Sequence, residues 1–321
     1  MIDESRDQAW EKLFENMDLG KWVELQSMMG PDSPRLNAAR EIALKSCAAH
    51  RETLEQIPLG LAFTRNLNGK VVKSPQNEYV IVLDMGVIYV GYSNNALWNC
   101  ILSYVIHQPL LTTHSLGSLF AAIINLAKFS KSGNLNMLLD DSITHEAVLV
   151  QDPTRFIEGS LGYEVFTILH EYGHVILGHL NLSEEQLDRC YIDRDGNSHT
   201  LWHVSEFHAD EFALIHMCKI MTGEVAMYWL CQFFRFLQLC EIVEPIVGQA
   251  RTHPPAEARW KRLIAVAVLK GLLPSDRKTM AQHLDGWAQV LIQAAATGAD
   301  LSSCTVTLTH ENDSRTVFDA H

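Results

Sequence analysis

The sequence has few of the features that mark secreted or membrane-spanning proteins. Its seven cysteines are odd in number and include no C-x-x-C pair, which argues against a disulfide framework and against a zinc site built on thiolates. No uncharged apolar run reaches about 18 residues, so no membrane span is expected. The first residues, MIDESRDQAWEKLFENMD, are acidic and lack the apolar segment of a signal peptide. We therefore expect a cytoplasmic protein.

Basic residues are also scarce. The 321 residues contain 25 Lys and Arg against 38 Asp and Glu, which gives a formal net charge of −13. Such a surface repels phosphate backbones and argues against nucleic acid as a partner. The remaining composition, 47% hydrophobic and 20% charged, is that of an ordinary globular protein.

A small antiparallel sheet is expected within residues 58–95. β-branched and aromatic residues gather there, and an Asn-Gly pair in the turn 66–70 indicates a hairpin. The expected strands are VVK at 71–73, YVIVLDM at 79–85 and VIYVGY at 87–92.

Helical patterns dominate the rest of the chain and predict an α+β fold that is mostly helical. Residues 1–57 are interpreted as an N-terminal helical extension, 58–298 as one domain and 299–321 as a C-terminal tail. The segment 140–153 is expected to be a connection with a short strand at 146–150. The helices expected in the main domain are 95–107, 115–131, 156–181, 204–221, 224–243, 255–271 and 276–297, with Ser115 and Ser205 as N-caps.

The stretch TILHEYGHVILGHL at 167–180 contains the pattern H-E-x-x-H. Residues four apart on a helix lie about 40° apart around its axis, so His170 and His174 share a face and can bind one Zn²⁺. Glu171 lies about 100° from His170, where a base can take a proton from a metal-activated water. Two histidines and a glutamate in an apolar helix are costly without partners. The pattern therefore predicts a zinc site.

The same helix contains a third histidine and two glycines. His179 is about 140° around the axis from His174, so we expect it to stay out of the site, favoured there by the helix dipole or by a local hydrogen bond. Gly173 and Gly178 each weaken a helix by roughly 1 kcal/mol relative to alanine. We expect them to allow the close approach of a neighbouring segment.

A third ligand is expected from the helix at 204–221. Glu206 and Asp210 are four residues apart and share a face, which Ala209 keeps small. We assign Glu206 as the third zinc ligand and Asp210 as the acceptor for the outer N–H of a ligating histidine. If Glu206 points away, His203 and His208 are the alternatives.

The segment Thr252-His253-Pro254-Pro255 leads into the helix that contains Arg259. His253 is a candidate to stabilise an oxyanion, and Arg259 is a candidate partner for a carboxylate of the site. The plainer alternative is a helix begun by proline, with both side chains exposed.

Taken in order, H-E-x-x-H, E-x-x-A-D and T-H-P-P-x-x-x-R resemble the motifs of gluzincin metallopeptidases of the heat-shock membrane protease and CAAX-prenyl protease type. The separation of 32 residues between His174 and Glu206 is shorter than in that family, and is similar to that in the ImmA-type and Lit-type phage-exclusion peptidases. The resemblance implies a zincin-like catalytic core over 156–271. It also implies His170, His174 and Glu206 as zinc ligands, Glu171 as the base, Asp210 as a ligand's partner, and His253 and Arg259 near the active site.

The function expected from these residues is that of an intracellular zinc endopeptidase acting on a protein or peptide, with the sheet binding an extended substrate as an added strand. A regulatory partner protein is a further possibility. One alternative is a silent zinc protein that senses or binds a partner, in which case a fourth protein ligand would close the site. The other is a defence or toxin peptidase that acts only when triggered.

Overall fold

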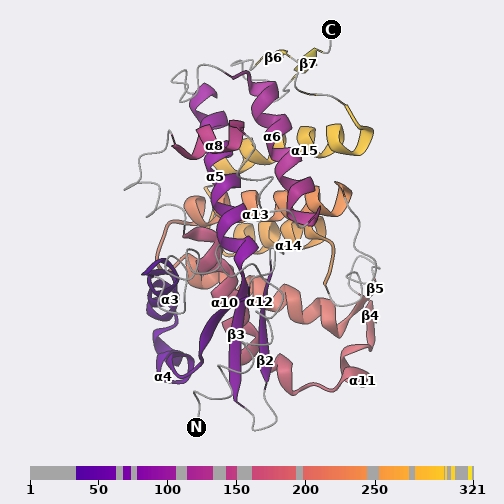
Figure 1. Ribbon diagram of the computed structural model, residues 1–321. Coiled ribbons are helices and arrows are strands. Elements are labelled where there is room, and N and C mark those ends of the chain that lie inside the picture. The colour runs from indigo at the N-terminus through magenta and orange to yellow at the C-terminus, as the bar shows by residue number, and fades with distance from the viewer. Residues whose placement is uncertain are drawn as a thin grey trace.

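The computed structural model describes twelve parts of the chain, coloured along the sequence in Figure 1. Predictions that fall elsewhere, including those for residues 1–33, for the turn 66–67 and for most of the tail, lie outside the described residues. The described residues are 34–62, 68–73, 78–105, 114–132, 142–149, 161–192, 198–243, 253–274, 279–299, 301, 305–307 and 317–319.

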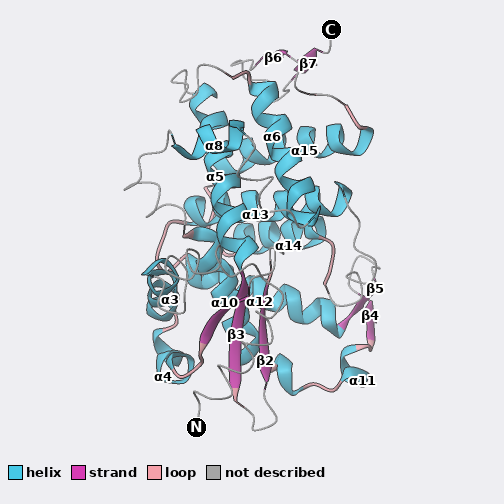
Figure 2. Ribbon diagram, in the orientation of Figure 1, coloured by secondary structure: helices cyan, strands magenta, loops and turns pink. Residues whose placement is uncertain are grey.

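The fold is α+β and mostly helical, as the sequence predicts. A small sheet lies at one end of a helical body, as Figure 2 shows by colour. Besides the elements introduced below, the structure contains α4 (Arg51–Glu55), α11 (Glu184–Leu187), α15 (Met280–Thr297), the 3₁₀ turns η1 (Ala48–His50) and η2 (His179–Asn181), and the two-stranded pairs β4 (Cys190–Ile192) with β5 (Ser198–Thr200) and β6 (Thr305–Thr307) with β7 (Val317–Asp319).

The three-stranded sheet is mixed, which corrects the prediction of an antiparallel one. Its strands are β1 (Leu59–Ala62), β2 (Gly69–Lys73) and β3 (Tyr79–Asp84), in the order β1-β3-β2. β2 pairs antiparallel with β3, whereas β1 pairs parallel with it. Consecutive residues of β1 are buried, while exposure alternates in β3; burial on both faces is typical of a parallel strand. β2 is an edge strand of this sheet.

Two predictions of strand are wrong. Residues 87–92 belong to α5 (Met85–Val105), and residues 146–149 belong to α8 (Ser142–Leu149). α5 packs against α6 (Leu116–Ser132), α8, α10 (Gly162–Ile176) and α13 (Gly223–Val243). Because α5 has neighbours on several sides, its sequence is apolar around most of its circumference and lacks the one-sided stripe of a surface helix. The N-cap predicted for α6 is confirmed, since Ser115 Oγ accepts from Ser118 N.

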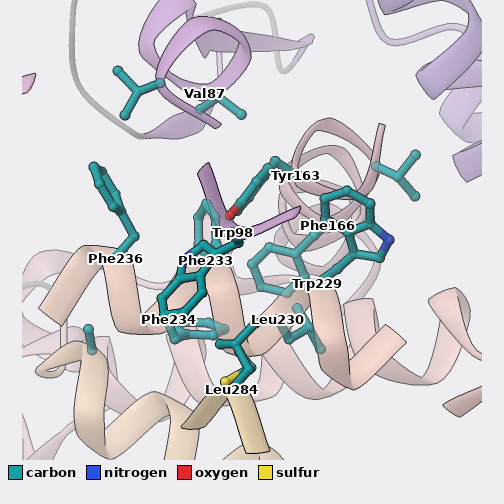
Figure 3. Close-up of a cluster of buried hydrophobic side chains, with 14 of the residues drawn as sticks. Val87, Trp98, Tyr163, Phe166, Trp229, Leu230, Phe233, Phe234, Phe236 and Leu284 are labelled. Carbon is teal, nitrogen blue, oxygen red and sulfur yellow. The ribbon is translucent and has the colours of Figure 1, made fainter. Parts of the chain in front are cut away.

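The helix α10 is at the centre of the fold. It packs against α12 (Leu201–Met217), α13, α5, α3 (Pro34–Ser46) and strands β2 and β3. Aromatic side chains fill the space between α10 and α13, as Figure 3 shows. Tyr163 meets Trp229 edge-on with ring centroids 5.7 Å apart, and Phe166 meets Phe233 at 5.2 Å. Such contacts fix the rotation of α10 and hence the direction of its polar face.

Residues 34–57 share this core. Leu36, Ala43 and Leu54 are buried in it, and Arg35 of α3 pairs with the buried Glu164 of α10. The domain boundaries expected from the sequence stay a prediction. The six described cysteines are free, and four of them are buried. In the parts of the chain that the structure describes, no helix is long and apolar enough to cross a membrane.

Candidate metal centre

The H-E-x-x-H pattern lies on α10, as expected, in a helix described from Gly162 to Ile176. The helix is buried from Gly162 through Gly173, so its polar side chains must find partners inside the protein. The predicted end at 181 is wrong. The chain leaves the helix at Leu177, and Gly178 adopts a left-handed conformation with φ of 72°, a common helix ending that favours glycine.

The second helix of the site, α12, begins earlier than expected. β5 leads directly into it, and Thr200 is the N-cap, with its side chain accepting from His203 N at 3.3 Å. Ser205, predicted as the cap, lies inside the helix and is buried. Because α12 begins at Leu201, Glu206 and Asp210 lie beyond its first turn, where the backbone is held by helical hydrogen bonds.

The helices α10 and α12 approach closely because both have small residues at the contact. A Cβ atom added to Gly173 would lie 3.1 Å from Ala209 Cα and 3.3 Å from Phe212 Cβ. The close approach expected at Gly173 is therefore confirmed. The presence of Gly178 has a different cause, namely its positive φ.

Three side chains from these helices converge on one point. The Nε2 atoms of His170 and His174 are 3.1 Å apart, and they lie 3.4 and 3.3 Å from the carboxylate oxygens of Glu206. A single metal ion can contact all three residues, which form a largely buried group suited to hold one. Oε2 of Glu206 is buried and has no hydrogen-bond partner among the described residues. Such an orphaned oxygen fits a metal ligand.

Asp210 and Arg259 hold the ligand His170 in its orientation through a chain of hydrogen bonds. His170 Nδ1 is 2.9 Å from Asp210 Oδ1, which leaves Nε2 directed at the convergence point. Arg259, on α14 (Ala256–Leu269), donates to both oxygens of Asp210 at 2.8 and 2.7 Å. Its Nη1 atom is 3.5 Å from Glu206 Oε2. A bidentate guanidinium fixes the carboxylate that in turn fixes the ligand histidine.

The charges of the site shift the pKa values of its members. Burial disfavours the protonated form of His170, but its hydrogen bond to Asp210 and the negative charges of Asp210 and Glu206 outweigh this effect and raise its pKa to about 10. Burial also opposes ionisation of Glu206, yet the two histidines and Arg259 hold the pKa of Glu206 well below its usual value. The metal-free site therefore binds a proton on His170 that a metal ion would replace.

Glu171 lies beside His170, His174 and Glu206 but is not one of the three converging side chains. It is buried, and burial raises its pKa, partly offset by the charges of His170 and His174. A Cβ atom added to Gly69, the first residue of the edge strand β2, would lie 3.4 Å from Glu171 Oε1. The Glu171 side chain thus lies between the candidate metal site and the sheet edge, and its raised pKa suits a general base.

A small cavity of about 30 Å³ opens beside these residues. It lies between the start of β2 and the aromatic residues of α10 and α13. Besides site residues His170, Glu171, Glu206 and Arg259, its lining consists of Asn68, Gly69, Phe166, Thr167, Phe233 and Leu237.

His253 lies at the edge of the site. Its Nε2 atom is 3.7 Å from Glu206 Oε2, and 30% of its side chain is exposed. The alternatives to Glu206 lie elsewhere: the ring of His208 stacks on that of His179 with centroids 6.2 Å apart, and the ring of His203 contacts His199. Residues of all three sequence motifs therefore lie together at one site, and His253 is its partly exposed member.

His179 contacts the site without joining its ligands. Its Nδ1 atom lies 3.0 Å from His174 Nδ1, so the expected local hydrogen bond is present, and His179 stays out of the group formed by His170, His174 and Glu206, as the sequence predicts. Angles around a continued helix do not apply here, because the helix ends before Gly178. The glycine just before His179 was the sequence signal for that ending.

Comparisons of the chain with models of protein families, with curated proteins and with solved structures find no match. Function is therefore inferred from the side chains that converge on α10 and α12.

Proposed function

We propose that this protein is a zinc-dependent endopeptidase that hydrolyses peptide bonds of a protein substrate. The observation that carries the proposal is the convergence of His170, His174 and Glu206 with a buried glutamate, Glu171, beside them. Two imidazoles and one carboxylate are a common ligand set of catalytic zinc.

The spacing of the ligand atoms supports zinc. A tetrahedral ion with bonds of about 2.0–2.1 Å requires about 3.3–3.4 Å between its ligands, and the observed separations are 3.1, 3.4 and 3.3 Å. Charge supports a dication as well. Among the described residues, the carboxylates of Glu171, Glu206 and Asp210 lie near one guanidinium, that of Arg259, and a dication would balance the remaining negative charge.

The proposed chemistry divides between the ion and the chain. Bound zinc would lower the pKa of a water towards about 7 and polarise the scissile carbonyl. Glu171 accepts the proton of the attacking water at its carboxylate and passes it to the leaving amine. His253, which is partly exposed beside Glu206, can donate a hydrogen bond to the oxygen of the carbonyl. Asp210 and Arg259 keep His170 oriented throughout.

The position of β2 supports an extended peptide as the substrate. β2 is an edge of the sheet, its first residue lines the cavity beside Glu171, and an edge strand can pair with a peptide by backbone hydrogen bonds. A substrate strand added there would pass next to the proposed base. Catalysis requires an open coordination position, and the described group has three ligand side chains, whereas structural zinc usually has four. For this reason we favour a peptidase over a silent zinc protein.

The test uses two buried glutamates of the same helix. The zinc-loaded protein, Glu171→Gln and the control Glu164→Gln are each incubated with a denatured cell proteome, and new N-termini are identified by mass spectrometry. Glu164 is buried on α10 like Glu171 but pairs with Arg35. We expect new N-termini with the wild type and with Glu164→Gln. With Glu171→Gln, the rate at which they form should fall at least 100-fold while zinc stays bound. Equal cleavage by wild type and Glu171→Gln would overturn the proposed mechanism.

A further inference from the structure

We propose that His179 is a positioning residue, which accepts a hydrogen bond from His174 Nδ1 and thereby holds His174 in the tautomer that leaves Nε2 free for a metal ion. The inference deepens the proposed function and rests on it, because it concerns the same zinc site. It assigns a role to a histidine outside the H-E-x-x-H, E-x-x-A-D and T-H-P-P-x-x-x-R motifs.

The geometry of the two rings carries the inference. His174 Nδ1 and His179 Nδ1 are 3.0 Å apart, and the ring planes meet at 73° with centroids 5.0 Å apart. On the other side of the same ring, His174 Nε2 is 3.3 Å from Glu206 Oε1. The His174 ring is thus held at both nitrogens, by His179 on one side and by the ligand group on the other.

Only one arrangement of protons suits a metal ion. A neutral imidazole has one N–H, and a nitrogen that binds a metal cannot keep its proton. If His174 Nε2 binds the ion, Nδ1 must hold the proton, and the atom 3.0 Å away must accept it. His179 Nδ1 is that acceptor. The opposite order would place the proton of His174 on Nε2, where it blocks the site.

The chain places His179 there by leaving the helix α10 just before Gly178. Gly178 has φ of 72°, and the 3₁₀ turn η2 that follows begins with His179. The turn is tied to the sheet as well, since Lys73 at the end of β2 donates to Asn181 Oδ1 at 2.8 Å. A side chain at position 179 therefore returns over the last turn of α10, instead of continuing around the helix axis.

The choice of a histidine fits the charge of the site. His170 already has a carboxylate partner, Asp210, which Arg259 neutralises. In the described parts of the chain, no cation is recorded next to His179, and its ring contacts those of His174 and His208. A neutral acceptor orients His174 without adding a further negative charge next to Glu206. On this reasoning asparagine, whose Oδ1 atom resembles the histidine Nδ1 in reach, should replace His179.

The experiment compares zinc affinity in four proteins: wild type, His179→Ala, His179→Asn and the control His283→Ala, which removes an exposed histidine of α15. Affinity is measured by competition with a chelator, and the ring nitrogens of the zinc-loaded proteins are followed by ¹H–¹⁵N NMR. Loss of the partner of a ligating histidine typically costs 10- to 100-fold in metal affinity. We expect that loss in His179→Ala, and affinity near the wild-type value in His179→Asn and His283→Ala.

The NMR signal separates positioning from a structural effect. A protected Nδ1–H of His174 is expected in the wild type and in His179→Asn, and in His179→Ala that proton should exchange quickly with water. If His179→Ala binds zinc as the wild type does, or if His179→Asn is as weak as His179→Ala, the inference is wrong while the zinc site stands. If the wild type binds no zinc, the proposed function itself fails.

Discussion

Replacing Arg259 by methionine removes a guanidinium that contacts two buried carboxylates of the site, Asp210 and Glu206. The side chains of Arg259, Asp210 and Glu206 are 10%, 1% and 9% exposed. Breaking a buried ion pair from one side costs about 3–5 kcal/mol, because the remaining charge stays desolvated. With a urea dependence of about 3 kcal/mol/M, the unfolding midpoint of the zinc-free protein should fall by about 1 M or more.

The same helix offers a matched control. Arg262, three residues further along α14, pairs with Glu211 at 2.6 Å, but its side chain is 50% exposed. A surface pair contributes about 0–1 kcal/mol, so Arg262→Met should barely move the midpoint. Adding Asp210→Asn to Arg259→Met should recover part of the loss, since the two residues are coupled. If the two arginine variants lose equal stability, the assignment of Arg259 as a buried counter-ion is wrong.

Two further predictions concern His170 and Gly173 of α10. In the zinc-free protein, protonated His170 stabilises the fold fully below its ordinary pKa of 6.5, and this stabilisation is lost as the pH rises through about 10. The free energy of unfolding measured in urea should therefore fall between pH 7 and 10. In His170→Gln this fall should be smaller. Gly173→Ala forces a Cβ to within 3.1 Å of Ala209 Cα, whereas nothing lies within 4 Å of a Cβ at Gly286 on α15. Gly286→Ala should therefore raise stability by up to about 1 kcal/mol, while Gly173→Ala should lower it by about 1–3 kcal/mol and weaken zinc binding. Equal effects of the two alanines on the urea midpoint would contradict the close packing of α10 and α12.

The parts of the site that depend on helical spacing were predictable from the sequence. His170 and His174 share a face by their four-residue separation, and so do Glu206 and Asp210. Both pairs are where the spacing places them. The number of residues between the two motifs did not predict how α12 would cross α10. That crossing is set by Gly173 against Ala209, a contact between residues 36 positions apart.

The errors have physical causes. VIYVGY at 87–92 is rich in β-branched and aromatic residues, but it lies in α5, whose packing partners on several sides favour large apolar residues whatever their strand propensity. The parallel pairing was missed because β1 (Leu59–Ala62) was not among the expected strands, and β-strand propensity contains no information on strand direction. The hydrogen-bond partner of His179, which is His174, did not follow from helical angles, because the left-handed Gly178 ends the helix before His179.

The most direct test of the account is the coordination of zinc in crystals of the full chain, located by anomalous scattering at the zinc absorption edge. We predict one zinc ion bound by Nε2 of His170, Nε2 of His174 and a carboxylate oxygen of Glu206, with bonds of about 2.0–2.2 Å and a fourth position that no protein atom fills. A fourth protein ligand closing the site, or crystals grown with zinc that show none at these residues, would contradict it.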